Sequence, residues 1–184
     1  GGTYFPLTVK KHLRAQEIAF EIGKNLVFLS SSRQDLPEKH HSMRAAFDYS
    51  WQLLTEEQRH AFRKLSIFRG GFDRQAAGDV AGAGLVDLSV LVDKSFVRCN
   101  EEYRYEIHEL LRQYGQGKLS EDAGEFEEIS QRHSDFYFDF LEHQKTYITG
   151  AEQLDARDAI RTELENMRAA IRWGITSGDE ANVH

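Results

Sequence analysis

The sequence predicts a mainly α-helical protein built around a winged helix, and three observations support this fold class. Apolar residues recur at helical spacing along most of the chain, and only Pro6 and Pro37 could interrupt a helix. Two short segments on either side of Asn100 alternate like the strands of a hairpin. Three short helices are expected directly before this hairpin, which is the element order of a winged helix.

The first part of the winged helix is expected at residues 41–54, where an amphipathic helix carries Phe47, Trp51 and Leu54 on one face. Thr55 to Gln58 has the pattern of a capping box, which predicts a second helix through Leu65. Residues 30–37 are polar and end in proline, so they are interpreted as a linker or domain boundary.

The remaining elements of the winged helix follow from local signals. Asp73 can cap a third short helix that ends near Ala81, because glycines follow it. A helix at 85–94 then precedes strands at 95–99 and 103–107. Another helix is expected to start near His108, which places the winged-helix domain at residues 37–122.

The two flanking regions are also predicted to be helical. Residues 1–36 are interpreted as the remnant of a small helical domain with its linker. Residues 123–184 are interpreted as an incomplete array of antiparallel helices of the α-solenoid type. Its last long helix is expected at about 151–176, with an inward-facing apolar stripe. The stripe comprises Leu154, Ile160, Leu164, Met167 and Ile171.

Composition narrows the possible functions. The net charge is −7, and residues 123–184 hold six basic against thirteen acidic side chains, so no region as a whole offers a concentrated basic surface for nucleic acid. A local basic stripe is left open. The basic run 59–64 and the acidic run 122–128 are both interpreted as solvated surfaces. One cysteine and no long apolar run predict a cytoplasmic protein without membrane contact.

No motif for catalysis or metal binding is found. The chain lacks the glycine-rich phosphate loop with its lysine, so it is not expected to hydrolyse a nucleotide by itself. Cys99 is interpreted as a wing cysteine, and His133, on the apolar face of its helix, as a hydrogen-bonded core residue. We therefore expect no catalytic residue, no metal and no enzyme activity in this chain.

DNA binding by the winged helix is the main alternative. The helix at 85–94 would enter the major groove, but its exposed face offers Asp87 and Asp93, with Lys94 as its one cation. Two carboxylates would face phosphates, so DNA contact through this segment is not favoured. The best support for the alternative is Arg98 and Arg104 on the wing.

The chain also resembles a family, the STAND regulatory ATPases, which are signal-transduction ATPases common among bacterial transcription regulators. The resemblance covers about residues 13–178. Five segments carry it: LPEKHHSMRAAFDYSWQLL at 36–54, LSIFRGGF at 65–72, LVDKS at 91–95, YEIHELLRQY at 105–114 and LENMRAAIRW at 164–173.

This resemblance implies a role for the intact protein. The segment would follow the nucleotide-binding core and contain a winged helix and the start of a tetratricopeptide-like region. Its partners would be that core and the helical repeats of the same chain, with ADP or ATP bound in the intact protein and a further protein partner possible. His108, within Ile107-His108-Glu109, matches the histidine of the family's Met-His-Asp motif, which touches the nucleotide phosphate. The residues alone also allow His108 to cap the helix or to pack beside Tyr105.

Overall fold

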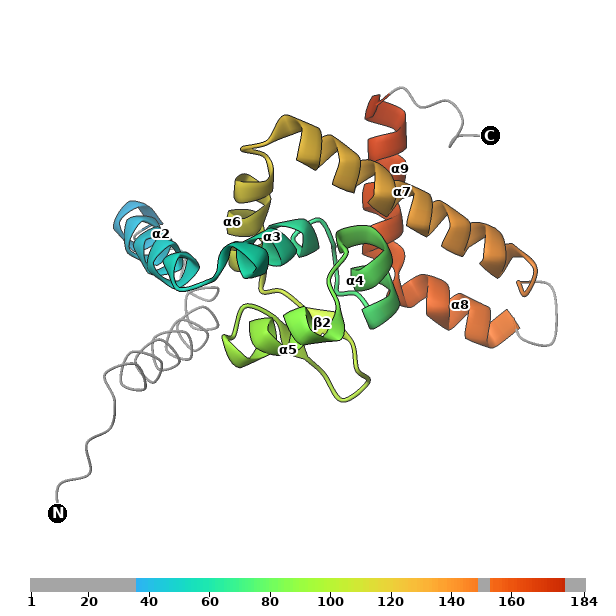
Figure 1. Cartoon of the computed structure of the whole chain (residues 1–184). Coiled ribbons are helices and arrows are strands. Elements are labelled where there is room, and N and C mark those ends of the chain that lie inside the picture. Colours follow the sequence, from blue (N-terminus) through green and yellow to red (C-terminus); the bar gives the residue numbers. More distant parts are fainter. Residues whose placement is uncertain (1–35, 149–152, 178–184) are drawn as a thin grey trace, which may run out of the picture.

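A computed structural model of the chain describes residues 36–148 and 153–177. The expected helical remnant at 1–36 therefore lies outside the described residues, except for Leu36. Within the described ranges the protein has eight helices and one two-stranded sheet, which confirms a mainly helical fold with a single hairpin (Figure 1).

The elements follow the predicted order. The first helices are α2 (Leu36–Gln52), α3 (Glu56–Leu65), α4 (Arg74–Ala81) and α5 (Leu85–Asp93). The wing consists of β1 (Arg98–Cys99) and β2 (Tyr105–Glu106). The later helices are α6 (Glu109–Leu119), α7 (Ala123–Lys145), α8 (Gln153–Thr162) and α9 (Leu164–Ser177).

Local capping determines where the short helices begin. Gln58 N donates to Thr55 Oγ1 at 3.4 Å and Thr55 N donates to Gln58 Oε1 at 3.1 Å, so the predicted capping box is present. Asp73 accepts from Ala76 N at 2.7 Å and caps α4 as expected. Gly82 ends α4 with φ of 66°, a conformation that glycine adopts without steric cost.

Helices α4 and α5 form a helix-turn-helix. A three-residue turn joins them and their axes are bent by 108°, within the range typical of this motif. Both helices pack against α3, and the buried side chains form one apolar core. The largest fully buried apolar side chains of this part are Phe62, Leu65, Phe72, Val80, Leu88, Leu91 and Val97.

The wing is shorter than predicted and is held from two sides. Arg98 faces Glu106 across the hairpin, and the Asn100 side chain closes the turn by accepting from Glu102 N and Arg104 N. On its other side β2 exchanges two backbone hydrogen bonds between Phe72 and Tyr105, at 2.9 Å and 2.8 Å. The wing is therefore attached to the turn that follows α3.

The C-terminal helices pack on the winged helix through α7, which contacts α4, α6 and α9. The expected single helix over 151–176 is wrong in one respect: it breaks at Glu163, and α8 and α9 run in different directions (Figure 1). Backbone hydrogen bonds from Glu163 N to Ala159 O and from Met167 N to Glu163 O continue on both sides, so the break is confined to one residue.

The predicted inward stripe of this last helix is also largely wrong. Leu154, Leu164 and Ile171 are exposed by 70%, 37% and 42%, whereas Met167 is buried as predicted. The buried positions of α8 and α9 are mostly small or polar: Ala156, Asn166, Ala170 and Gly174. Small side chains let α9 approach α7 closely. The face of α9 that packs against α7 is therefore not the face that carries most of its large apolar side chains.

No single helix within the described ranges is both long and apolar enough to cross a membrane, and only the bent pair α4 and α5, taken together, has sufficient length and apolar composition.

The contact between α3 and α6 gives a stability test with an internal control. A Cβ added at Gly115 would lie 2.8 Å from the Phe62 ring and 2.9 Å from Ser66 Cβ, whereas Gly117 on the same helix has open space. Gly115→Ala should therefore destabilise the fold by about 1–3 kcal/mol. Gly117→Ala should stabilise it by about 0.5–1 kcal/mol because alanine favours helix. Urea unfolding measures both, and equal effects would contradict the close packing of α6 on α3.

Candidate functional site

His108 lies at the junction between the wing and α6 and is half-buried. It is the N-cap of α6, and its Nδ1 accepts from Leu110 N at 3.4 Å. Burial and the nearby charge of Arg98 lower the pKa of His108 below its usual value, so the ring is neutral at pH 7. Because Nδ1 accepts, Nε2 carries the proton and can donate to an acceptor.

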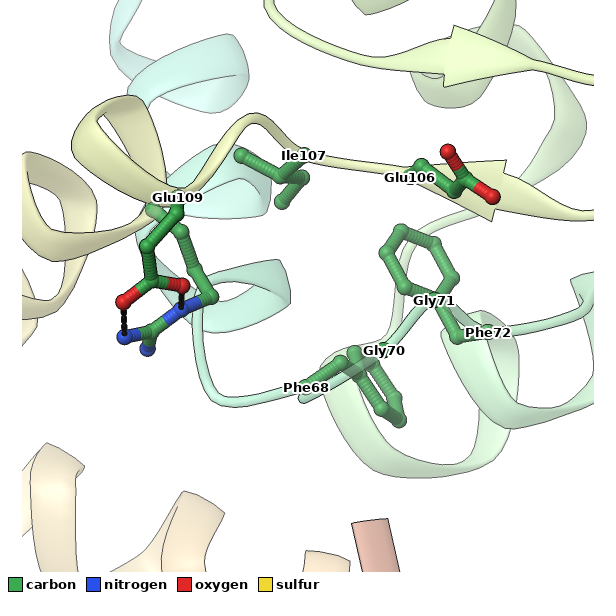
Figure 2. A pocket seen from close by; sticks show the side chains of 8 residues that line it. Phe68, Gly70, Gly71, Phe72, Glu106, Ile107 and Glu109 are labelled. Carbon is green, nitrogen blue, oxygen red and sulfur yellow. Dashed lines mark hydrogen bonds and ion pairs between the residues drawn. The ribbon is translucent and has the colours of Figure 1, made fainter. Parts of the chain in front are cut away.

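A cavity of about 300 Å³ lies next to this junction (Figure 2). Ile107 and Glu109, the two neighbours of His108, line it together with Gly70, Gly71 and four other residues, but His108 itself does not. Gly71 has φ of 94°, and a Cβ there would meet Tyr105 O at 3.0 Å, so close approach of the wing requires glycine.

The electrostatics of this cavity do not suit a phosphate. Its one cation is Arg112, which donates from Nε and Nη2 to both carboxylate oxygens of Glu109 at 2.8 Å (Figure 2). Arg112 also donates to Ser66 O, and its pairing lowers the pKa of Glu109 to about 2. With Glu106 as a further carboxylate, the cavity presents more negative than available positive charge.

The exposed face of α5 does not resemble a DNA-reading surface. Leu85 and Val86 at the start of α5 are exposed by 52% and 77%, and Asp93 at its other end is exposed as well. Asp87 caps its own helix by accepting from Gly84 N. Lys94 turns away, donating to Leu53 O and Gln58 Oε1, so it is not available to phosphate.

The two wing arginines are not brought together. Arg98 is exposed on β1, whereas the Arg104 guanidinium is largely buried and forms an ion pair with Glu163 at the α8–α9 break. Arg104 therefore holds the wing to the C-terminal helices and is not free to contact DNA. Of the two wing arginines, Arg98 therefore remains the one candidate for contact with nucleic acid.

Asn166 connects α9 to the turn after α3. Its side chain is fully buried, and its oxygen accepts from Arg69 N at 2.6 Å. Its amide nitrogen donates to Gly71 O at 2.8 Å and to Glu163 Oε2 at 2.9 Å. Both donors and the acceptor are thus used, as a buried amide requires.

The hydrogen-bonded group around Asn166 and Glu163 also includes side chains of α7. Tyr137 donates from its hydroxyl to Glu163 Oε2 at 3.1 Å. His133 Nε2 lies 3.4 Å from the Asn166 oxygen, and since that oxygen accepts, His133 donates. Burial lowers the pKa of His133 to about 4, so it is neutral, as predicted for a hydrogen-bonded core histidine. We call Arg104, Tyr137, His133, Glu163 and Asn166 the junction network.

A second polar contact corrects the interpretation of the acidic and basic runs. Glu125 on α7 is mostly buried and pairs with Arg63 at 2.7 Å, with Lys64 at 3.8 Å and with His60 at 3.3 Å. Neither run is simply solvated, because the fold brings these parts together from positions some sixty residues apart. The sequence separation is the reason that local patterns did not reveal the pairing.

Sequence reasoning missed the residues of the junction network other than Arg104 and His133. One signal was present: Asn166 is a polar residue between apolar positions of a helix, and Glu163 lies one turn before it. Such a polar pair in an amphipathic helix indicates a buried hydrogen-bonded contact. No cluster of potential metal ligands is found among the described residues.

The junction network can be tested by removing one charge at a time. Arg104→Met leaves Glu163 buried without its cation and should lower the free energy of unfolding by about 3 kcal/mol. The double variant Arg104→Met/Glu163→Gln should recover part of that loss, because no unpaired charge remains.

Arg98→Met on the same wing is the matched control and should change stability by less than about 0.5 kcal/mol. Urea unfolding of the four proteins measures these differences. Equal effects of Arg104→Met and Arg98→Met would show that the wing is not held by Glu163.

Comparison with known proteins places the chain near bacterial regulators. It is 34% identical over 173 residues to candidate HTH-type transcriptional regulators of Mycobacterium bovis and of two strains of Mycobacterium tuberculosis. These matches cover 88% of this chain and 19% of each relative, so the chain spans about a fifth of their length. Their name agrees more directly with the transcription-regulator alternative than with an ATPase fragment.

Shorter matches carry little weight. The β chain of methylcrotonoyl-CoA carboxylase from Dictyostelium discoideum is 66% identical over 32 residues, which is 17% of this chain and 5% of that protein. No family model matches the chain, and no solved structure matches it significantly. What is similar over most of the chain is therefore a segment of a transcriptional regulator.

Proposed function

We propose that this chain is a non-catalytic segment of a transcriptional regulator, in which the winged helix docks internally against a helical array. The observation that carries the proposal is the ion pair between Arg104 of the wing and Glu163 of the array. A wing that reads DNA presents its cations to solvent, whereas this wing directs one of its two arginines into a buried contact. Similarity to regulators over most of the chain supports the class of parent protein.

The exposed part of α5 suits a protein partner in this arrangement. Its surface combines two exposed apolar side chains, Leu85 and Val86, with carboxylates. Apolar side chains next to acidic ones favour contact with a protein surface over contact with phosphates. The helix-turn-helix would then serve protein contact inside the regulator.

A more specific proposal is that this segment senses whether ADP or ATP is bound in the parent protein. The resemblance to STAND ATPases implies that ADP or ATP is bound by a core elsewhere in the parent protein. His108 fits one contact with such a ligand, because its neutral ring has a proton on Nε2 that can be donated to a phosphate oxygen. The neighbouring cavity with Glu106 and Glu109 does not fit a phosphate, so the other contacts would come from the nucleotide-binding core.

His108→Ala in the complete regulator tests this role. Loss of one hydrogen bond to a charged phosphate should weaken ADP retention about tenfold. His143→Ala, at an exposed histidine on α7, is the control and should leave retention unchanged. Nucleotide content after purification and ADP titration measure the effect, and equal retention in both variants would refute nucleotide sensing by His108.

Direct DNA binding is the second candidate function. The names of the mycobacterial relatives and the 108° helix-turn-helix favour it. In this case Arg98, exposed on the wing, would contact the phosphate backbone.

A DNA titration of this chain by fluorescence anisotropy, at low and physiological salt, separates the two functions. Internal docking predicts that the chain does not bind duplex DNA at either salt concentration. Direct DNA binding predicts salt-sensitive binding that Arg98→Glu removes and that Arg161→Glu, on the exposed surface of α8, weakens far less. That second result would replace the docking proposal.

A further inference from the structure

A second cavity, of about 260 Å³, lies between α6, α7 and α9, away from His108. The winged helix contributes Arg69 and Gln116 to its wall, and α9 contributes Arg172 and Trp173. Ser130 of α7 also lines it. We call it the junction cavity, because its walls belong to both parts of the fold.

The junction cavity carries positive charge that the fold does not neutralise. Among the buried and half-buried arginines of the described ranges, Arg69 alone lacks a carboxylate ion-pair partner; its side chain donates to Gln116 Oε1. Burial and the charges of Arg112 and Arg172 lower the pKa of Arg69, and the Glu109 carboxylate, which pairs with Arg112, opposes this shift. The carboxylate that lines the cavity, Glu165, pairs with Arg168 at 2.6 Å, which leaves Arg69 and Arg172 without a carboxylate partner among the described residues. Bringing like charges together is costly unless an anion lies between them.

A buried hydroxyl faces the same cavity. Ser130 is 3% exposed and its Oγ has no hydrogen-bond partner among the described residues. Buried hydroxyls are normally hydrogen-bonded, so an unpartnered one in a cavity wall indicates a missing acceptor or donor. This observation is independent of the arginines and points to the same space.

Part of the cavity wall is aromatic. Phe126 and Trp173 pack edge to face with ring centroids 5.8 Å apart, and both line the cavity. Trp173 donates from Nε1 to Gln131 at 3.1 Å, which fixes the orientation of its ring. A flat apolar group could pack against this wall while a charged group faces the arginines.

We propose that the junction cavity binds a small organic anion, with its phosphate or carboxylate group held by Arg69, Arg172 and Ser130 and a flat apolar group against Trp173. Such a ligand would contact the winged helix and α9 at once. Binding would therefore strengthen the attachment between the two parts, independently of nucleotide or DNA binding elsewhere.

Phenyl phosphate and benzoate are the probes. Benzyl alcohol is the control that has the aromatic ring without a charge, and inorganic phosphate is the control that has the anionic group without the ring. Calorimetric titration and the thermal unfolding midpoint of this chain are the two readouts. We expect both aromatic anions to bind and raise the midpoint, with benzyl alcohol and inorganic phosphate binding at least about tenfold more weakly. Comparison of phenyl phosphate with benzoate identifies the preferred anionic group.

Two variants test the residues. Arg172→Gln, at an exposed and unpaired side chain, should weaken the better anion about tenfold without unfolding the protein. Ser130→Ala should weaken it as well, while leaving the midpoint of the free protein equal or higher, because it removes an unpartnered buried hydroxyl. Arg161→Gln removes one charge outside the cavity and should leave affinity unchanged.

Three results would overturn the proposal. Absence of binding at millimolar concentrations of either anion would show that the cavity is not an anion-binding site. If benzyl alcohol binds as tightly as the two aromatic anions, the arginines do not bind the anionic group. Equal loss of affinity in Arg172→Gln and Arg161→Gln would indicate diffuse attraction to the surface instead of a site.

Discussion

The buried side chain of Asn166 is the contact on which the arrangement of this protein depends. Its amide bonds to the backbone of the turn at Arg69 and Gly71 and to Glu163, so α9 can pack in only one register against the winged helix. A shift by one residue would leave three buried polar groups unpaired, each at a cost of roughly 1–3 kcal/mol. Apolar packing alone tolerates such sliding, whereas a fully satisfied polar network does not.

The break between α8 and α9 follows from the same contact. Neither proline nor glycine lies at residue 163, and the backbone hydrogen bonds are kept on both sides. Glu163 instead points its carboxylate toward Arg104 and Tyr137, and α9 turns so that Asn166 reaches the glycine turn. The bend is thus set by tertiary contacts, and the sequence of the helix contains no local signal for it.

The elements that could be predicted from sequence are those that short-range chemistry determines. The capping box at Thr55, the cap at Asp73 and the hairpin around Asn100 each depend on residues within four positions of one another. The failures concern contacts across long separations: Glu125 with Arg63, and the face of α9 that meets α7. His108 shows the same division, because its capping role is local, while the proposed contact with a nucleotide would depend on groups that are distant in sequence.

The distribution of charge links the fold to its proposed role. Arg63 and Arg104 each pair with a carboxylate from a distant part of the chain, so their charges hold the parts together. Arg112 pairs with Glu109 on its own helix and also donates to Ser66 O, so its charge is used within the fold as well. An internal docking element requires this pattern, because cations committed to carboxylates are unavailable to phosphates. Where the pattern stops, at Arg69 beside Arg172, positive charge remains at the boundary between the two parts. A ligand bound there would act on the attachment that the junction network maintains, and this makes the boundary the natural place for control of the docked state.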